Sequence, residues 1–377
     1  MAYASYRGFS WCLMLLFTLS GLLRLGLFRC AVRHGGKRYR SMLSDLLHRT
    51  LKDLRISVTD RCNFRCTYCM PLDKYEWIDR SEILSFEEIE RLARLFIQLG
   101  VEKIRLTGGE PLLRHDLERL VALLAPLDLK DLSLTTNGSL LAEKAGALAA
   151  AGLRRVNVSV DTLQPEKFRR LTRRDDLPRI LDGLHAARKA GLEPIKINAV
   201  IERGVNDDEI LDLVEFARAN RFVLRFIEYM DVGNSNNWRS DRTVTKTEIL
   251  KMISGRLPLQ EAGREGGNAP SVDYRFDDDE GSVGIIASVS EPFCGGCTRA
   301  RLTADGKLVT CLFSGQGSDL KKLIRGGASD QDMLDAITSI WKGRGDRYSE
   351  ERLAALQSAE GYDAGGRRKI EMISLGG

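Results

Sequence analysis

Three closely spaced cysteines near the start of the chain indicate a metal centre. The stretch TDRCNFRCTYCM, residues 59–70, contains Cys62, Cys66 and Cys69. A structural zinc site is usually tetrahedral and closed, so zinc would need a fourth ligand from elsewhere. Three thiolates can instead bind three irons of a [4Fe–4S] cluster and leave the fourth iron open to another ligand. The spacing therefore favours an open iron–sulfur cluster, with a zinc knuckle as the alternative.

A second group of three cysteines lies near the other end of the chain. The segment CGGCTRARLTADGKLVTC contains Cys294, Cys297 and Cys311. No histidine lies near this group in the sequence, although an aspartate or glutamate could complete a zinc site. Clustered thiols without distant partners indicate a metal and a reducing compartment rather than a disulfide framework. We predict a second open [4Fe–4S] cluster here, again with zinc as the alternative.

Several cations accompany the cysteines. Arg299 and Arg301 are two residues apart just after the second CxxC, so on an extended segment they point to the same side. Arg55, Arg105 and Lys196 fall within apolar runs that are expected to be strands. Guanidinium groups match phosphate in a bidentate manner, and buried positive charge is costly unless an anion offsets it. Together these cations predict an anionic ligand.

Strands and helices in alternation must position these groups. Six short apolar runs, each followed by a helical pattern, indicate a parallel sheet with its active residues at the carboxyl ends of the strands. Six units are too few to close an eightfold barrel, so we expect an α/β fold built on a partial, open-sided (β/α)6 barrel. A doubly wound open sheet is the alternative. The runs are 54–59, 103–108, 131–137, 155–161, 194–201 and 223–230.

Composition divides the chain into four parts. Residues 1–41 contain seven Lys or Arg and no acid, and they include the apolar stretch 11–28. This leader is open to three interpretations: a start assigned upstream of the functional Met42, a transit peptide, or a membrane anchor. We expect a barrel over 42–254, a Gly- and Pro-rich connector over 255–270, and a C-terminal cysteine-bearing region over 271–377 that ends in Gly-Gly.

Net charge argues against nucleic-acid binding. Beyond the leader the chain carries 50 basic and 52 acidic residues. A nucleic-acid binding protein usually shows a basic surplus on its surface, and no such surplus remains here. We therefore predict no nucleic-acid partner.

The first cysteine group and a glycine-rich turn resemble the radical S-adenosylmethionine superfamily. The residues that carry the resemblance are CNFRCTYCM and LTGGEP at 106–111. The resemblance implies a six-stranded partial barrel whose open iron chelates S-adenosylmethionine. It also implies that an electron from the cluster cleaves this cofactor to a 5′-deoxyadenosyl radical, and that backbone at Gly109 holds the methionine amine. Glycine backbone can approach a ligand closely because it carries no side chain.

Further motifs resemble the GTP 3′,8-cyclase family of molybdenum cofactor biosynthesis. These motifs are FCGGCTRARL, TTNG, RFIEYMDVGN and the final LGG, and the likeness runs from about residue 50 to the end. It implies that the second open cluster contacts guanine. Catalytic roles are implied for Arg55, Arg299 and Arg301. Contacts with GTP are implied for Arg55, Arg105, Thr135, Lys196, Arg299 and Arg301. Contacts with S-adenosylmethionine are implied for Tyr68, Gly109, Ser159 and Met230.

The same resemblance implies a reaction and its partners. The radical would take the ribose 3′ hydrogen of GTP, and the carbon radical would add to C8 of guanine and then be reduced. Arg55 is expected to help quench the last radical, and the tail at Gly376 and Gly377 is expected to reach the active site. Expected partners are a reductant and the next pathway enzyme, cyclic pyranopterin monophosphate synthase, and a homodimer is left open. The expected location is the cytoplasm, or the mitochondrial matrix if residues 1–41 are a transit peptide.

Two other functions compete with this one. A peptide-modifying radical enzyme with auxiliary clusters would also combine two cysteine groups, but such enzymes carry more cysteines in the C-terminal part. A zinc-binding nucleic-acid module would use the same CxxC elements without redox chemistry. The charge balance and the six strand–helix units argue against the second alternative.

Overall fold

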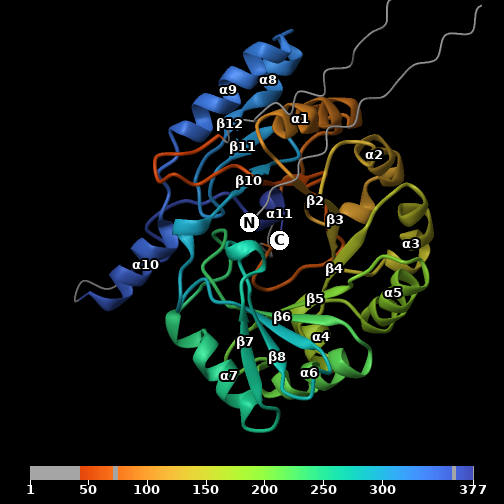
Figure 1. Ribbon diagram of the computed structural model, residues 1–377, viewed down its shortest axis with the longest axis vertical. Coiled ribbons are helices and arrows are strands. Elements are labelled where there is room, and N and C mark those ends of the chain that lie inside the picture. Colours follow the sequence, from red (N-terminus) through yellow and green to blue (C-terminus); the bar gives the residue numbers. More distant parts are fainter. Residues whose placement is uncertain (1–42, 71–74, 359–361, 377) are drawn as a thin grey trace, which may run out of the picture. The chain divides into compact units, whose positions relative to one another are not determined.

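Six parallel strands, neighbours in chain order, form the centre of the fold (Figure 1). Consecutive order without a reversal is typical of a barrel wall, whereas a doubly wound sheet reverses its strand order. The predicted α/β fold is thereby confirmed, and its strand order is that of the partial barrel rather than of the alternative. The strands are β1 (Asp53–Ser57), β2 (Lys103–Thr107), β3 (Asp131–Thr136), β4 (Arg155–Ser159), β5 (Lys196–Ile201) and β6 (Val223–Glu228).

The computed structural model describes residues 43–70, 75–358 and 362–376. The predictions made for residues 1–41 and for Gly377 lie outside the described residues. Within the described part of the chain, no helix is long and apolar enough to cross a membrane.

Helices cover the outer face of the barrel. In β1, Leu54 and Ile56 are buried and belong to the apolar core shared with the helices, and Arg55 alternates with them toward the inside. The first helix begins at a capping box made by Ser85 and Glu88. The barrel helices are α1 (Phe86–Gln98), α2 (Leu117–Leu124), α3 (Leu141–Ala150), α4 (Pro165–Thr172), α5 (Leu177–Lys189), α6 (Ile210–Ala219) and α7 (Lys246–Ser254).

The C-terminal region extends the same sheet at both edges. One edge continues from β6 to β9 (Ser282–Ile286), which is parallel to it, and then to β8 (Val272–Phe276) and β7 (Leu259–Gly263). The other edge continues from β1 to β10 (Arg299–Leu302), again parallel, then to β11 (Lys307–Val309) and β12 (Ser318–Asp319). The segment 255–270, which we expected to be a connector, therefore contains a strand of the sheet.

Four helices complete the C-terminal part, and the last one enters the barrel region. They are α8 (Leu320–Arg325), α9 (Asp330–Lys342), α10 (Tyr348–Gln357) and α11 (Met372–Leu375). Figure 1 shows α8 and α9 beside β11 and β12, whereas α11 lies near the centre of the view within the ring of strands. The end of the described chain thus lies close to the strands that carry the predicted site.

Candidate active site

The first cysteine group lies on a loop at the carboxyl end of β1. Backbone N–H groups of Cys69 and Met70 both donate to the carbonyl oxygen of Cys66 at 3.1 Å, which turns the loop back on itself. Burial raises the pKa of all three thiols, that of Cys62 to about 11. No cation within the loop offsets this burial strongly. The thiolate form here therefore depends on a bound positive group, which iron would supply.

The glycine-rich turn after β2 packs directly against this loop. A Cβ on Gly109 would lie 2.4 Å from the carbonyl oxygen of Arg61, so only glycine fits. Glu110 is fully buried and accepts hydrogen bonds from Thr136 Oγ1 and the Asn137 backbone N–H, each at 2.7 Å. Burial outweighs these bonds and raises the pKa of Glu110 to about 7. The turn thus combines close backbone approach with a carboxyl group held inside the protein.

The second cysteine group lies at the opposite end of the same strands. Cys297 precedes β10, which runs parallel to β1, and Cys311 follows β11, which is antiparallel to β10. Both therefore lie at the amino end of β1, while Cys62 follows its carboxyl end. Five residues of strand separate the groups by roughly 15 Å. All six cysteines line a single cavity and none forms a disulfide.

A row of arginines crosses the cavity wall between the two groups. Arg301, Arg55 and Arg105 are register partners on β10, β1 and β2, and all three line the cavity. Burial and mutual repulsion lower the pKa of each, that of Arg301 to about 10. Within the described residues, Nε of Arg105 and of Arg301 is buried without a hydrogen-bond partner. Unpaired buried donors of this kind fit an anion in the cavity.

Cations also surround the second cysteine group itself. Burial opposes ionisation of Cys297, but the nearby Arg299 and Arg344 overcome it and lower the pKa of this thiol to about 6. Arg299 Nη2 lies 3.2 Å from the Cys297 sulfur, and Arg344 Nη1 donates to the Cys297 carbonyl oxygen at 2.8 Å. Arg49 Nη1 donates to the Cys294 carbonyl oxygen at 3.0 Å. These cations favour the thiolate form of Cys297 alone, because burial raises the pKa of Cys311 to about 11.

Most of the remaining predicted residues line the same cavity. Tyr68, Gly109, Thr135, Ser159 and Met230 all do so. The Tyr68 hydroxyl donates to Asp161 Oδ2 at 2.7 Å, and burial raises the pKa of this aspartate to about 6. The contacts that these residues make with ligands stay predictions.

Lys196 is the exception among the predicted residues. It lies at the first position of β5 and is not part of the cavity wall. Its Nζ is 3.7 Å from Glu265 Oε2, which is also 3.6 Å, through Oε1, from Nζ of Lys103. Burial and neighbouring arginines lower the pKa of Lys196 to about 8. The segment that carries Glu265 thus places a carboxylate near the amino ends of β2 and β5.

The structure adds residues that the sequence reasoning missed. Arg225 on β6 lines the cavity, and its Nε is buried without a partner among the described residues. Its place in the apolar run VLRFIE could have revealed it, because Arg55 and Arg105 stand in similar runs. Arg49 and Arg344 also line the cavity and share Asp45 as their buried carboxylate. Asp45 and Arg49 are four residues apart, but no sequence signal links them to Arg344, which is almost three hundred residues away.

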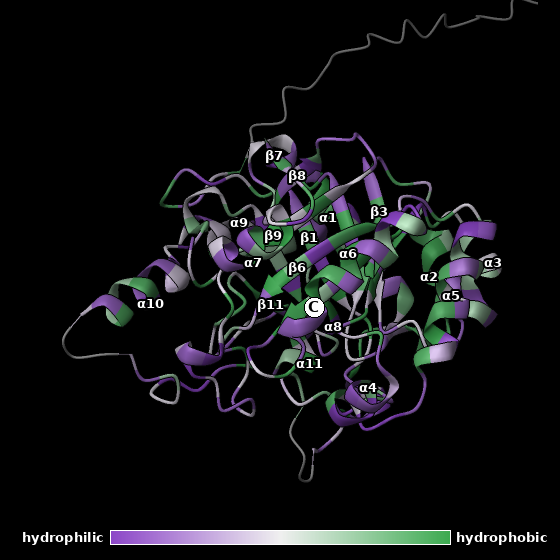
Figure 2. Ribbon diagram, turned by 90° about the horizontal axis from the view of Figure 1, so that it is seen from below, coloured by the Kyte–Doolittle hydropathy of each residue, from purple (hydrophilic) through white to green (hydrophobic). Residues whose placement is uncertain are grey.

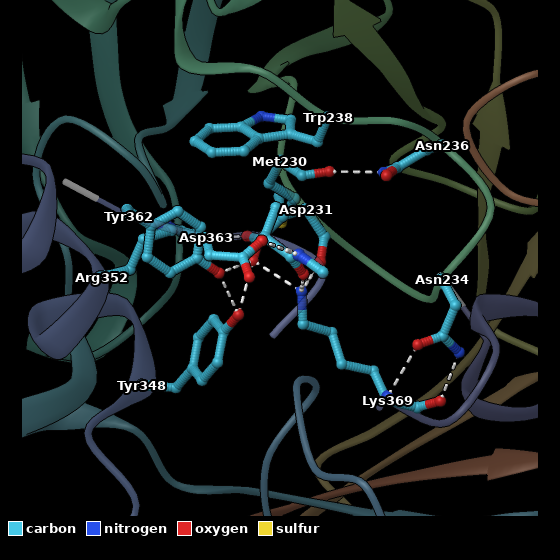
Figure 3. A network of polar contacts seen from close by, with 12 residues as sticks. Met230, Asp231, Asn234, Asn236, Trp238, Tyr348, Arg352, Tyr362, Asp363 and Lys369 are labelled. Carbon is cyan, nitrogen blue, oxygen red and sulfur yellow. Dashed lines mark hydrogen bonds and ion pairs between the residues drawn. The ribbon is translucent and has the colours of Figure 1, made fainter. Parts of the chain in front are cut away.

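A buried network attaches the C-terminal segment to the loop after β6. Asp231 is 1% exposed and bonds Arg352, Lys369, Tyr348 and Tyr362 (Figure 3). The neighbouring loop residue Met230 lines the cavity, so the network joins the cavity wall to the tail.

Beyond this network the tail reaches the barrel. Met372 lines the cavity, and a Cβ on Gly376 would lie 2.2 Å from Thr107 Cγ2 at the end of β2. The position of Gly376 agrees with the expected approach of the tail to the active site. Gly377 itself is outside the described residues.

The two thiol sets are compatible with [4Fe–4S] clusters. In the described chain, no three His, Cys, Asp or Glu side chains are grouped so that they could hold one metal ion. In a [4Fe–4S] cluster each thiolate binds a different iron, so its cysteines do not meet at one point. Three free thiols at each end of one cavity match this requirement.

Comparisons with known proteins identify the superfamily. The family model described as Radical SAM superfamily matches residues 56–217, and the model described as Molybdenum Cofactor Synthesis C matches residues 222–350. The structure of SuiB from Streptococcus suis bound to S-adenosylmethionine aligns with a TM-score of 0.54. That alignment covers 81% of this chain and 68% of SuiB at 16% identity, so it supports the fold alone.

Relatives of higher identity cover most of this chain. A GTP 3′,8-cyclase from Acidothermus cellulolyticus is 50% identical over 358 aligned residues, and the alignment covers 89% of this chain and 99% of the relative. A GTP 3′,8-cyclase from Staphylococcus epidermidis is 43% identical over 345 aligned residues, and the alignment covers 90% of this chain and 100% of the relative. Membership of the superfamily implies a [4Fe–4S] cluster and S-adenosylmethionine. The chain belongs to the GTP 3′,8-cyclase family of the radical S-adenosylmethionine superfamily.

Proposed function

We propose that this chain is a radical S-adenosylmethionine enzyme that cyclises GTP to (8S)-3′,8-cyclo-7,8-dihydroguanosine 5′-triphosphate. This reaction is the first step of molybdenum cofactor biosynthesis. The observation that carries the proposal is the row Arg301, Arg55 and Arg105, buried between two sets of three free thiols. A polyanionic substrate between two metal centres explains why such costly charges stand there.

The end of the cavity at the carboxyl side of the strands would hold the first cluster and S-adenosylmethionine. Cys62, Cys66 and Cys69 would bind three irons, and the reduced cluster supplies the electron that releases a 5′-deoxyadenosyl radical. The backbone at Gly109 offers close approach to the methionine part of the cofactor. Tyr68, Ser159 and Met230 line the wall where the rest of the cofactor would lie.

GTP would lie across the arginine row toward the other end of the cavity. Guanidinium groups bind phosphate oxygens through paired N–H groups, so Arg55, Arg105, Arg299 and Arg301 are suited to the triphosphate and ribose. Arg225, which lines the same wall, joins this set. Thr135 offers a hydroxyl group on β3. Lys196 lies outside the cavity wall, and its ammonium group pairs with the carboxylate of Glu265.

Cys294, Cys297 and Cys311 would hold another open [4Fe–4S] cluster, which would offer a free iron to the guanine base. The lowered pKa of Cys297, to about 6, supports a site that keeps this ligand ionised near neutral pH. The main work of the protein is then to hold the ribose 3′ carbon close to the deoxyadenosyl carbon and to exclude water. Arg55 is placed between the two ends, where it would assist the final reduction.

Partners and location follow from this activity. The enzyme would take electrons from an external reductant and pass its product to cyclic pyranopterin monophosphate synthase. It would work in the cytoplasm, or in the mitochondrial matrix if residues 1–41 direct it there. Assembly as a homodimer is a further part of the proposal, and size-exclusion chromatography with light scattering tests it.

Anaerobic reconstitution tests the reaction. The chain from Met42 is loaded with iron and sulfide and incubated with GTP, S-adenosylmethionine and dithionite, and 5′-deoxyadenosine is followed by chromatography. We expect deoxyadenosine that depends on GTP, together with a cyclised product of GTP mass. Deoxyadenosine formed equally well without GTP, with no cyclised product, would contradict the substrate assignment and favour a peptide-modifying enzyme.

A further inference from the structure

The first cysteine loop lies at the protein surface and is joined there to α4. Thr67, between Cys66 and Tyr68, is exposed. Its backbone N–H donates to the Leu171 carbonyl oxygen at 3.0 Å, and the Arg65 N–H donates to the Thr172 carbonyl oxygen at 3.0 Å. The rings of Phe64 and Phe168 pack edge to face with centroids 5.8 Å apart. The loop and the C-terminal end of α4 therefore form one continuous surface.

This surface carries an excess of positive charge. It presents five arginines that have no carboxylate partner among the described residues: Arg61, Arg65, Arg170, Arg173 and Arg174. Arg174 binds the loop through the Asn63 carbonyl oxygen at 2.7 Å, and Arg65 binds the carbonyl oxygens of Cys62 and Phe64. Neither contact reduces the charge. We call these five residues the arginine rim.

The acids on α4 and in the turn after it are already engaged by other residues. Asp175 and Glu166 both pair with Arg169, and Asp176 pairs with Arg179. Figure 2 shows α4 at the lower edge of the view with hydrophilic residues along its ribbon. Four arginines of the rim are exposed and Arg65 is half-buried, beside the loop that would hold the first cluster.

The surface beside the second cysteine group differs. There Glu350 binds both Arg347 and the backbone N–H of Gly295, and the buried Arg49 and Arg344 share Asp45. These cations beside the second group have carboxylate partners, whereas the five arginines of the rim have none among the described residues.

We propose that the arginine rim is the docking surface for a small acidic electron-carrier protein that reduces the first cluster. The inference rests on the proposed function, because that reaction needs an electron from outside the chain. The carrier loses one electron, the group held by Cys62, Cys66 and Cys69 gains it, and no bond or proton is exchanged. Electron-transfer complexes bury small areas and depend on complementary charge for rapid encounter, which suits a polar rim of this kind.

The test uses two double variants of the reconstituted holoenzyme. Arg170→Glu/Arg173→Glu reverses the rim without touching residues assigned to the cavity. Arg154→Glu/Arg221→Glu makes the same charge change near the amino ends of β4 and β6, where both arginines are exposed. The pairs are matched in backbone strain, since Arg173 and Arg221 have φ values of 59° and 52°.

Reduced flavodoxin is the probe carrier, and stopped-flow absorbance follows the reduction of the cluster. We expect the rim variant to be reduced about tenfold more slowly than wild type at low ionic strength, and the control pair to match wild type. Added salt should bring the wild-type rate down toward that of the rim variant. Binding of oxidised flavodoxin, measured by calorimetry, should weaken in the rim variant alone.

Reduction by dithionite distinguishes a loss of carrier docking from damage to the fold or to the cluster. All three proteins should be reduced by dithionite at the same rate, because this small reductant needs no docking surface. Equal rates with flavodoxin for both double variants would overturn the proposal, and so would a rim variant that is equally slow with dithionite. Cyclisation of GTP with dithionite, measured on wild type, tests the proposed function independently of the rim.

Discussion

The two cysteine groups lie at opposite ends of one cavity, and their buried ionisable neighbours differ: acids at one end and arginines at the other. At the carboxyl end the buried neighbours are carboxyl groups, Glu110 and Asp161, whose pKa values burial raises to about 7 and about 6. At the amino end the neighbours are arginines, and they bring the pKa of Cys297 down to about 6. The first end suits a ligand that brings its own positive charge, as a sulfonium does. The second end suits an anion.

The largest expected effect comes from removing one cysteine at each end. Cys66→Ala should lower S-adenosylmethionine cleavage by on the order of 10³-fold or more, because the first iron–sulfur cluster would lose one of its three cysteine ligands. Cys297→Ala should keep cleavage of S-adenosylmethionine by dithionite while the cyclised product disappears. Chromatography of 5′-deoxyadenosine and of the nucleotide product distinguishes the two outcomes. Equal loss of cleavage in both variants would mean that the two ends do not divide the chemistry.

The buried Glu110 at the first end of the cavity should make the free energy of unfolding depend on pH. Its pKa rises from 4.5 to about 7 on folding, so the folded state holds the proton more tightly than the unfolded state. The stability from this group is therefore fully present below about pH 4.5 and is lost as pH rises through about 7. The loss is roughly 3 kcal/mol for a shift of this size.

Glu110→Gln provides the matched variant. Denaturant unfolding of the metal-free protein from pH 4.5 to 8 should show a smaller slope in Glu110→Gln than in wild type; a slope remains because Asp161, whose pKa is also raised, still titrates there. The variant should also be less stable than wild type at low pH, because one amide donor would face the Asn137 N–H. A slope that is the same in both proteins would show that another group titrates.

A substitution of Arg105 tests the arginine end of the cavity, because it should raise the stability of the ligand-free protein and weaken GTP binding. Arg105→Met removes a buried cation whose pKa is lowered by burial and by Arg55, so the ligand-free protein should become more stable by about 1 kcal/mol. The same variant should bind GTP about tenfold to a hundredfold more weakly, because one charge-assisted contact is lost. Thermal unfolding with and without GTP measures both effects. Unchanged GTP binding together with a loss of stability would indicate a purely structural role, and Arg105→Lys controls for charge.

The sequence predicted the parts of this arrangement that repeat along the chain. The six strands of the barrel follow from apolar runs, and the placement of Cys62, Cys66 and Cys69 at a strand end follows from parallel topology. The places of β9 and β10 at the two edges of the barrel sheet were not predicted, because each pairs with a barrel strand that is distant in sequence. The sequence placed Lys196 on a barrel strand with an anionic ligand nearby. The structure places it at the first residue of β5, outside the cavity wall.

The partners of the second cysteine group were beyond prediction for a related reason. Arg49 and Arg344 are almost three hundred residues apart, and only Asp45, which binds both, brings them together. Pairing of this kind depends on tertiary structure and leaves no local pattern. Arg225 differs, because the sequence shows it in an apolar run that predicts a strand. Comparison with Arg55 and Arg105, which stand in similar runs, could have identified it as a cavity residue.

The smallest expected effect concerns the tail, which the structure places at the carboxyl end of the cavity. Gly376→Ala adds a methyl group whose carbon would lie 2.2 Å from Thr107 Cγ2, at a φ of +70°. The control Gly327→Ala has a φ of +83° and nothing within 4 Å of the added carbon. Each substitution should cost about 1 kcal/mol from backbone strain, but only Gly376→Ala should also displace the tail.

Activity then separates strain from displacement. Gly376→Ala should form several-fold less cyclised product for each 5′-deoxyadenosine, since the carboxyl end of the cavity loses part of its wall, whereas Gly327→Ala should keep the wild-type ratio. The ratio is informative because a general loss of stability would lower both products together. If both variants keep the wild-type ratio, the tail does not contribute to the difference between the two ends, and that difference resides in the strand residues alone.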